Sequence, residues 1–274
     1  MNNDRNTRPQ AVQEQDEEAT EMVTSTGGQG PLEGAVIAVA GAAGPAGRAT
    51  LLRLAEAGAV VIGSDSNPER LAEAVDAARY AHGGATVIGD TVDLLDPDQT
   101  REWAARTEKE FGRIDGLVHL VGGWRGSSTF AETDLADWDL LHRLLIRTVQ
   151  HTSLAFQEPL ERSGNGRFLL ISAAGASKPT GGNAAYAASK AAAEAWTLAM
   201  ADGFRKSGGE EGLRAAAAIL VVKALVNDQM RAERPNAKFA GFTDVKELAE
   251  AIAGVWSRPA QEVNGKRLWL TPEP

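Results

Sequence analysis

Tyr186 and Lys190 stand four residues apart in a stretch that is predicted to be helical, residues 185–204. At that spacing both side chains lie on one helix face, so the ammonium can stabilise a phenolate and lower the tyrosine pKa. A tyrosine tuned in this way can give or take a proton at a carbonyl group that undergoes hydride transfer. An ordinary amphipathic helix could carry the same pair, so support must come from the rest of the chain.

The surrounding pattern predicts the scaffold that would position this pair. Short apolar runs alternate with longer helical patterns, which is typical of a parallel sheet covered by helices. The predicted strands are residues 36–40, 60–63, 86–89, 117–121, 167–172, 216–222 and 267–270. The predicted helices are residues 46–57, 68–81, 98–111, 135–160, 185–204 and 244–256. We therefore expect an α/β fold with a doubly wound sheet of about seven strands between two helix layers.

Length and composition predict one domain. The 274 residues are 43% hydrophobic, which is enough for a sizeable core. Residues 1–31 are polar and end in a Gly-rich segment, so we expect a disordered acidic tail, or a partner-binding arm, before a domain at 32–274.

Charge and residue usage exclude several classes of function. A net charge of -9 argues against nucleic-acid and anionic-membrane partners and favours small molecules. The chain has no cysteine, which excludes disulfides and thiolate catalysis, and we expect no metal site. No bilayer-spanning run or signal peptide is visible, so we expect a cytoplasmic protein.

A glycine-rich loop, residues 40–47, lies between the first predicted strand and its helix. Backbone N–H groups and the helix dipole at such a place can hold a pyrophosphate. Pro45 lacks an N–H group and occupies space beside the phosphates, although the first helical position tolerates proline. Asp65 follows the second strand, where it can bind ribose hydroxyls or, alternatively, begin a capping turn with Asn67.

This loop resembles that of the short-chain dehydrogenase/reductase family, which carries Thr-Gly-x-x-x-Gly-x-Gly before such a helix. Gly41 and Gly47 match the outer glycines, whereas Ala40 replaces the threonine and Pro45 the middle glycine. The resemblance covers residues 33–271 and implies a Rossmann-type fold. It also implies a cofactor site at Gly41, Ala43, Gly44, Pro45, Ala46, Gly47, Asp65, Asp93, Leu94, Gly122, Tyr186 and Lys190.

The resemblance also suggests which dinucleotide binds. Asp65 would accept bonds from the ribose and repel a 2′-phosphate. Ala43, Gly44 and Ser66 supply no basic residue of the kind that related NADP enzymes use, so we expect NAD rather than NADP. Asp93 and Leu94 resemble the family's adenine-contacting pair, and a solvated turn would be the alternative.

By the same resemblance, Tyr186 is the general acid/base, and Lys190 lowers its pKa and binds the nicotinamide ribose. The family's catalytic serine stands thirteen residues before the tyrosine, at Ala173, so Ser172 would orient the substrate if the intervening loop holds one extra residue. The alternative is a strand-end serine bonded to the backbone. Leu145 replaces the catalytic asparagine. His119 is a hydrogen-bonded core residue or a proton carrier.

The region after the sixth strand departs from the family, because residues 221–225 replace its Pro-Gly motif. Residues 224–243 are predicted to form a substrate lid, or a plain surface loop. The expected substrate pocket is apolar and consists of Trp124, Leu145, Met230 and Phe239.

These residues favour an NAD-dependent oxidoreductase that interconverts a secondary alcohol and a carbonyl on a small, largely apolar substrate. The alternative is a nucleotide-binding sensor or scaffold with little or no turnover, which the replacements at Pro45 and Leu145 favour. A sugar-nucleotide epimerase or dehydratase would need a larger C-terminal domain than the chain provides. The resemblance further implies a homodimer or homotetramer.

Overall fold

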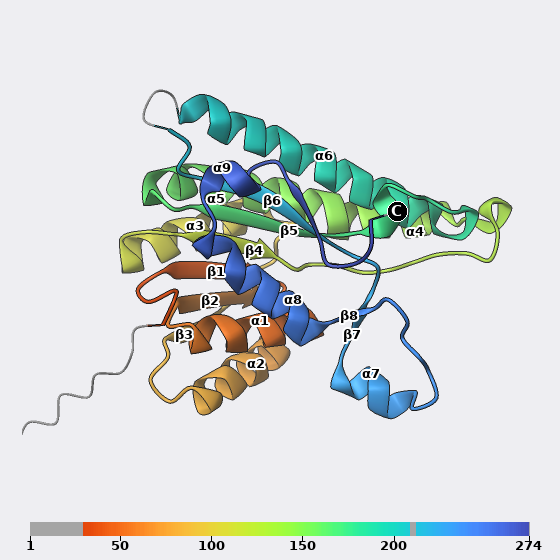
Figure 1. Ribbon diagram of the computed structural model, residues 1–274, viewed down its shortest axis with the longest axis horizontal. Coiled ribbons are helices and arrows are strands. Elements are labelled where there is room, and N and C mark those ends of the chain that lie inside the picture. The colour runs from red at the N-terminus through yellow and green to blue at the C-terminus, as the bar shows by residue number, and fades with distance from the viewer. Residues whose placement is uncertain (1–29, 209–211, 274) are drawn as a thin grey trace, which may run out of the picture.

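A parallel seven-stranded sheet forms the centre of the computed structural model, which describes residues 30–208 and 212–273. Its strand order is β3-β2-β1-β4-β5-β6-β9 (Figure 1). The strands are β1 (Val36–Ala40), β2 (Val60–Asp65), β3 (Val87–Thr91), β4 (Gly116–His119), β5 (Arg167–Ala173), β6 (Ala216–Val222) and β9 (Arg267–Trp269). The chain leaves β1 toward β2 on one side and returns to β4 on the other, so the predicted doubly wound fold is confirmed.

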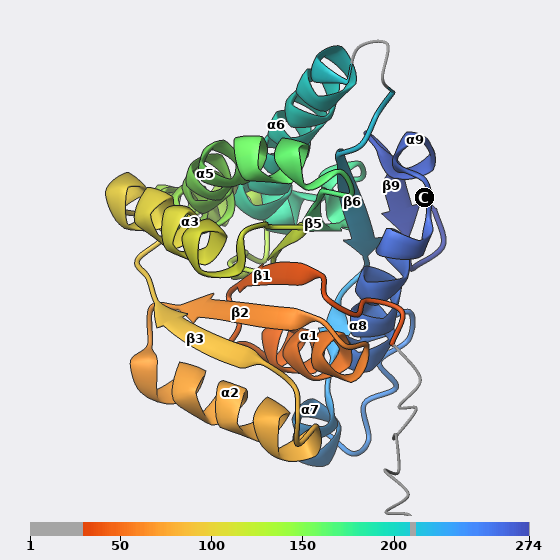
Figure 2. The same ribbon diagram turned by 90° about the vertical axis from the view of Figure 1, so that its left-hand side faces the viewer.

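Helices cover both faces of the sheet, as Figure 2 shows. Ile37 and Val39 of β1 pack with residues of α1 (Pro45–Glu56), α2 (Pro68–Ala81) and α8 (Val245–Gly254). Val36 and Ala38 face α3 (Pro97–Phe111), α5 (Thr148–Ser163) and α6 (Ala184–Ser207). Both faces of β1 are therefore buried, which explains its uninterrupted apolar sequence.

The first three helices begin where their sequences predict. Each has proline in its first turn, where no intrahelical N–H bond is lost. The Asn67 side chain caps α2 by accepting from the N–H of Arg70, and Asp96 caps α3 in the same way. Gly112 ends α3 in a left-handed conformation with φ 74°.

The predicted helix at residues 135–160 is interrupted. It consists of α4 (Leu135–Leu141), a π-helical segment (His142–Arg147) and α5. A π-helical turn holds more residues than an α-helical turn, so it rotates the side chains that follow. Within this segment, Leu144 lines the cavity described below, whereas Leu145 does not.

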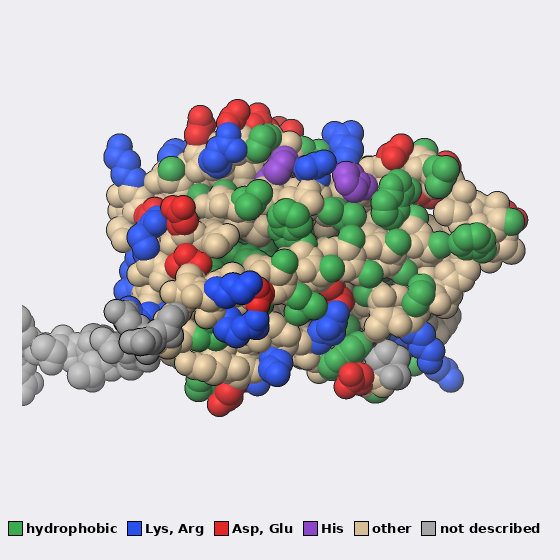
Figure 3. Space-filling view, turned by 90° about the horizontal axis from the view of Figure 1, so that it is seen from above, with side chains coloured by type: hydrophobic (Ala, Val, Ile, Leu, Met, Phe, Trp, Pro, Cys, Tyr) green, Lys and Arg blue, Asp and Glu red, His purple; other side chains and the backbone are tan. Residues whose placement is uncertain are grey.

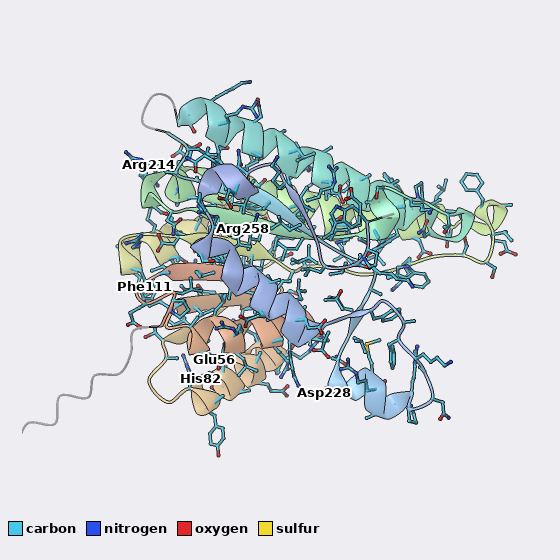
Figure 4. All side chains as sticks on the ribbon, in the orientation of Figure 1. Glu56, His82, Phe111, Arg214, Asp228 and Arg258 are labelled. Atoms are coloured by element: carbon cyan, nitrogen blue, oxygen red, sulfur yellow. The ribbon has the colours of Figure 1, made fainter. Side chains whose placement is uncertain are left out.

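The predicted lid, residues 224–243, contains regular structure that the sequence pattern did not indicate. Here β7 (Leu225–Val226) pairs with β8 (Thr243–Asp244), and α7 (Asp228–Glu233) lies between them. Asp228 projects from the start of α7 in Figure 4, and its carboxylate is 2.8 Å from the Lys246 ammonium of α8. The short helix α9 (Ala260–Val263) precedes β9.

The prediction of a disordered tail concerns residues 1–31, of which 1–29 lie outside the described residues. Across residues 30–208 and 212–273, no helix is long and apolar enough to cross a membrane. The same part of the chain contains no cluster of three or more His, Asp or Glu side chains that could hold a metal ion.

Candidate active site

The glycine loop between β1 and α1 is packed too tightly for side chains at two positions. Gly41 has φ 82°, and a Cβ atom there would lie 2.9 Å from the Val121 nitrogen. A Cβ atom on Gly47 would lie 2.2 Å from the Gly41 carbonyl oxygen. The two glycines therefore allow the start of α1 to approach the ends of β1 and β4.

Pro45 occupies the first position of α1, with Gly44 as the N-cap. The N–H groups of Gly41 and Ala42 donate to the Ser64 carbonyl oxygen at 2.9 Å each. The N–H groups of Ala46 and Gly47, in the first helical turn, have no intrahelical acceptor. Both residues line the adjoining cavity, so an anion there would meet two backbone donors despite the proline.

Asp65 lies at the end of β2, beside this loop. Its carboxylate accepts from the N–H groups of Ala43 at 3.2 Å and Asn67 at 3.1 Å. These bonds hold the carboxylate in place at the edge of the cavity, which Asp65 lines. The capping-turn alternative and the ribose-binding interpretation are thus compatible, because one side chain can do both.

Arg70 is a candidate binding residue that the sequence reasoning missed. It lines the same cavity as Asp65 and Ser66, and its guanidinium donates to the Ala43 carbonyl oxygen at 3.3 Å. The sequence positions expected to carry a basic residue were Ala43, Gly44 and Ser66, which are all uncharged. Arg70 could have been found from the predicted start of α2 at Pro68, because a residue in the first turn of that helix lies near the glycine loop.

Two cavities of about 530 and 540 Å³ adjoin one another at the carboxyl ends of the strands. We call them the loop cavity and the tyrosine cavity. The loop cavity contains the glycine loop, Asp65, Asp93 and Leu94, and the tyrosine cavity contains Tyr186 and Lys190. They share the residues Ala46, Leu120, Val121, Gly122 and Leu225. Because the two cavities lie side by side, together they suit an extended ligand better than a compact one.

Tyr186 and Lys190 both project from α6 into the tyrosine cavity. The Lys190 ammonium is buried and donates to the Ile171 carbonyl oxygen at 2.7 Å. Burial lowers the pKa of Lys190 to about 8, and the nearby Glu194 carboxylate opposes that shift. Burial raises the pKa of the Tyr186 phenol to about 12. The predicted lowering of this pKa by Lys190 is therefore wrong, because desolvation dominates at the phenol.

The Ser172 side chain forms a hydrogen bond with Glu194 that the sequence did not indicate. Its hydroxyl is buried beside the tyrosine cavity and donates to Glu194 Oε1 at 2.5 Å. A proton shared with Glu194 is less available to a substrate oxygen, so this contact competes with the predicted orienting role. The role itself stays a prediction. Ala173, at the family's usual serine position, also lines the cavity.

His119 is enclosed between two threonines of α5. Its ring nitrogens lie 3.2 Å from Thr148 Oγ1 and 3.1 Å from Thr152 Oγ1. Burial, with a smaller contribution from the Lys190 charge, lowers the pKa of His119 to about 3. The residue is thus a neutral, hydrogen-bonded core histidine at physiological pH, as the first of the two interpretations proposed.

The four residues predicted to form one apolar substrate pocket do not come together. Trp124 lines the tyrosine cavity, and Met230 lines the loop cavity. Leu145 is buried and lines neither cavity. Phe239 lines a smaller pocket that residues of the segment 224–243 form among themselves. The structure thus distributes these residues over different cavities, and their role in binding a substrate stays a prediction.

Comparison with known proteins gives consistent results. The family model for short chain dehydrogenases matches residues 35–220. The 3-oxoacyl-[acyl-carrier-protein] reductase of Escherichia coli K12 is 27% identical over 242 residues, which cover 86% of this chain and 96% of the reductase. The corresponding Thermotoga maritima reductase is 31% identical over 160 residues, covering 58% of this chain. The peroxisomal multifunctional enzyme type 2 of Mus musculus is 32% identical over 168 residues, covering 58% of this chain.

The chain matches 64% of the length of the Thermotoga reductase and 22% of the mouse enzyme. Among solved structures, the NADPH-bound short chain oxidoreductase of Pseudomonas aeruginosa PAO1, described as containing an atypical catalytic center, is 26% identical. The TM-score is 0.76, and the superposition covers 86% of this chain and 94% of the other. The matched family segment runs from β1 through β6 and includes the glycine loop, Asp65, Tyr186 and Lys190, so the chain belongs to the short-chain dehydrogenase family.

Proposed function

We propose that the protein is an NAD-dependent oxidoreductase that interconverts a secondary alcohol and a carbonyl group on a small substrate. The observation that carries the proposal is that the two cavities adjoin and share five lining residues. A dinucleotide held by the glycine loop and Asp65 would extend through the shared residues toward Tyr186 and Lys190. This places a nucleotide site next to a proton donor.

The residues present fit a dinucleotide. Gly41 and Gly47 let the loop pack closely against the start of α1, and Ala46 and Gly47 offer N–H donors for a pyrophosphate. Asp93 and Leu94 border the adenine end in this proposal, Asp65 binds the adenosine ribose, and Lys190 binds the nicotinamide ribose. When bound, the dinucleotide supplies or accepts the hydride.

Tyr186 supplies the proton in this proposal. In reduction, the carbonyl carbon gains a hydride and its oxygen gains the Tyr186 proton, which yields the alcohol. Because the pKa of Tyr186 is raised to about 12, the phenol stays protonated at neutral pH, as an acid must be. The reverse oxidation needs the phenolate, whose fraction falls tenfold for each pH unit below that value. We therefore expect reduction to be the faster direction at pH 7.

The preference for NAD rests on Asp65, whose carboxylate would repel a 2′-phosphate. Arg70 opposes this preference, because its guanidinium lines the same cavity and could pair with that phosphate. The Pseudomonas relative binds NADPH. We favour NAD because the ribose hydroxyls would meet the Asp65 carboxylate first.

A dinucleotide-binding sensor or scaffold with little turnover is the second candidate. Two observations favour it. The Ser172 hydroxyl bonds to Glu194, and Leu145, which replaces the family's catalytic asparagine, lines neither cavity. In each case the site lacks a free polar group that the family uses in catalysis, the serine hydroxyl or the asparagine amide. The Tyr186 and Lys190 pair in the tyrosine cavity favours the enzyme.

Titration with NADH and NADPH, followed by energy transfer from tryptophan to the nicotinamide, tests both candidates. We expect NADH to bind, with Trp124, which lines the tyrosine cavity, as the donor. Consumption of NADH is then measured against a panel of carbonyl compounds. Binding without any turnover would support the sensor, and binding of neither dinucleotide would contradict both candidates.

We also propose that the protein forms a homodimer or homotetramer through the face that carries α5 and α6. Hydrophobic side chains run along this face in Figure 3, and Leu154 of α5 is 64% exposed. Sedimentation equilibrium should give two or four times the monomer mass. A monomeric mass would contradict this assembly.

A further inference from the structure

Two lysines are among the residues that line the tyrosine cavity. Its charged lining residues are Lys190 and Lys223, and neither Asp nor Glu lines it. This is notable in a chain whose net charge is -9. We propose that the substrate carries an anionic group, such as a carboxylate, and that Lys223 binds it. The proposal rests on the proposed function and names the substrate class for that same site.

Lys223 is positioned but not neutralised. It follows β6 directly, is exposed, and its ammonium donates to the Ala240 carbonyl oxygen at 3.0 Å. Gly241, with φ 74°, leaves room for the lysine stem, because a Cβ atom there would lie 3.3 Å from Lys223 Cδ. An ammonium has three donors, so two remain after this bond.

Three neighbouring cations have acidic partners. Lys246 pairs with Asp228, Arg231 with Asp244, and Arg267 with Glu194. Within residues 30–208 and 212–273, no ion pair forms at Lys223. A cation that lines a concave, partly apolar site without a carboxylate partner attracts an anion more strongly than one already paired.

The remaining lining defines the other end of the substrate. Trp124, Val222 and Leu225 form apolar walls, and Tyr186 offers the proton donor. The substrate would thus place its carbonyl oxygen at Tyr186 and its anionic group at Lys223, with a short apolar body between them. This describes an oxo-carboxylate in reduction and the matching hydroxy-carboxylate in oxidation. The proposed substrate therefore differs from the largely apolar one expected from the sequence, because one of its ends is charged.

The test compares oxo-carboxylates with their methyl esters, which have nearly the same size but no charge. We expect the wild type with NADH to prefer the acids by about tenfold or more in kcat/KM, as a charge-assisted hydrogen bond provides. Lys223→Gln should reduce that preference by about tenfold, mainly through KM. Lys238→Gln removes the same charge from an exposed lysine that does not line the cavity, and should keep the preference.

Equal turnover of acids and esters by the wild type would overturn the proposal. So would an equal loss for both substrate classes in Lys223→Gln, which would assign Lys223 to holding the Ala240 segment. Neither result contradicts the dehydrogenase activity, whereas absence of NADH consumption with every compound contradicts the proposed function.

A binding measurement keeps the inference testable if turnover is absent. Non-reacting carboxylates and their amides are titrated against tryptophan fluorescence, with Trp124→Phe identifying the signal from the cavity. We expect carboxylates to bind the wild type and to bind Lys223→Gln at least fivefold more weakly, with the amides insensitive to the change. Equal binding of carboxylates to both proteins, or no binding to either, would overturn the inference.

Discussion

Ser172 and Glu194 share a buried hydrogen bond of 2.5 Å that joins the end of β5 to the middle of α6. The second carboxylate oxygen of Glu194 accepts from Arg267 of β9 at 2.7 Å. The bond therefore connects three elements directly behind the tyrosine cavity. It gives Ser172 a structural role one residue before Ala173, which stands at the family's usual serine position.

Ser172→Ala should lower the free energy of unfolding by about 1–3 kcal/mol, because it leaves a buried carboxylate oxygen without its donor. Turnover should fall less than tenfold, since the hydroxyl proton is shared with Glu194. Urea denaturation and steady-state kinetics measure the two effects. Ser189→Ala is the matched control on α6. The buried Ser189 hydroxyl has no hydrogen-bond partner among the residues that the structure describes, so this change should cost little stability. A hundredfold loss of turnover with unchanged stability in Ser172→Ala would instead assign the hydroxyl to the substrate.

Gly47→Ala should weaken NADH binding at least tenfold. The added Cβ atom would lie 2.2 Å from the Gly41 carbonyl oxygen, so the loop and the first turn of α1 must separate. Fluorescence titration measures the affinity. Gly254→Ala, in α8, meets no atom within 4 Å and should leave binding unchanged while adding about 0.5–1 kcal/mol of stability. Unchanged NADH affinity in Gly47→Ala would contradict the placement of the pyrophosphate at this loop.

His119 should make the protein sensitive to acid. Its pKa is about 3 in the folded protein against 6.5 in the unfolded chain, so the unfolded state binds the extra proton as pH falls below 6.5. The contribution is fully present above pH 6.5 and is lost progressively down to about pH 3. It amounts to about 2 kcal/mol lost by pH 5.

The effect is measured by urea denaturation at pH 5 and pH 8. His119→Gln should show a difference between the two pH values that is smaller than the wild-type difference by that amount. His82→Gln, at the surface end of α2 in Figure 4, should behave as the wild type does. An unchanged pH dependence in His119→Gln would mean that the histidine is not held neutral.

Asp65 and Arg70 should act in opposite directions on the choice of dinucleotide. Asp65→Asn removes the negative charge and should raise the ratio of NADPH to NADH affinity at least tenfold, whereas Arg70→Gln should lower it. Dissociation constants from fluorescence titration give the ratio. Glu69→Gln removes an exposed charge in the same helical turn and should leave the ratio unchanged. No change in Asp65→Asn would place the ribose elsewhere.

The sequence allowed much of the fold to be predicted, since burial leaves a strong local signal. Strand β1 and helix α2 were predicted to the residue, because a continuous apolar run and a proline-started amphipathic pattern are both explicit in the chain. The π-helical segment at His142–Arg147 was not predicted, as it depends on how α4 and α5 pack and not on a local residue type. The pairing of β7 with β8 joins two-residue strands, which are too short for any periodicity to show.

The candidate site was predicted less completely, for a different physical reason. The glycines, Asp65 and Tyr186 could be found because each stands at a fixed distance from a predicted strand or helix. Glu194 could not be identified, since a glutamate within a helix usually faces water and only the tertiary fold brings Ser172 and Arg267 to it. The pKa of Tyr186 was predicted in the wrong direction, because burial of the phenol cannot be judged from its spacing to Lys190.

Replacement of the Tyr186 phenol tests the central claim most directly. Tyr186→Phe removes one hydroxyl, and its matched control is Tyr80→Phe, which changes the chain's other tyrosine, 94% exposed on α2. Stopped-flow measurement of NADH oxidation by a reducible carbonyl compound gives the rate of hydride transfer. We predict a loss of about 10²–10⁴-fold in Tyr186→Phe, with NADH affinity within about threefold of the wild type and Tyr80→Phe unchanged. Hydride transfer at the wild-type rate in Tyr186→Phe would contradict the account.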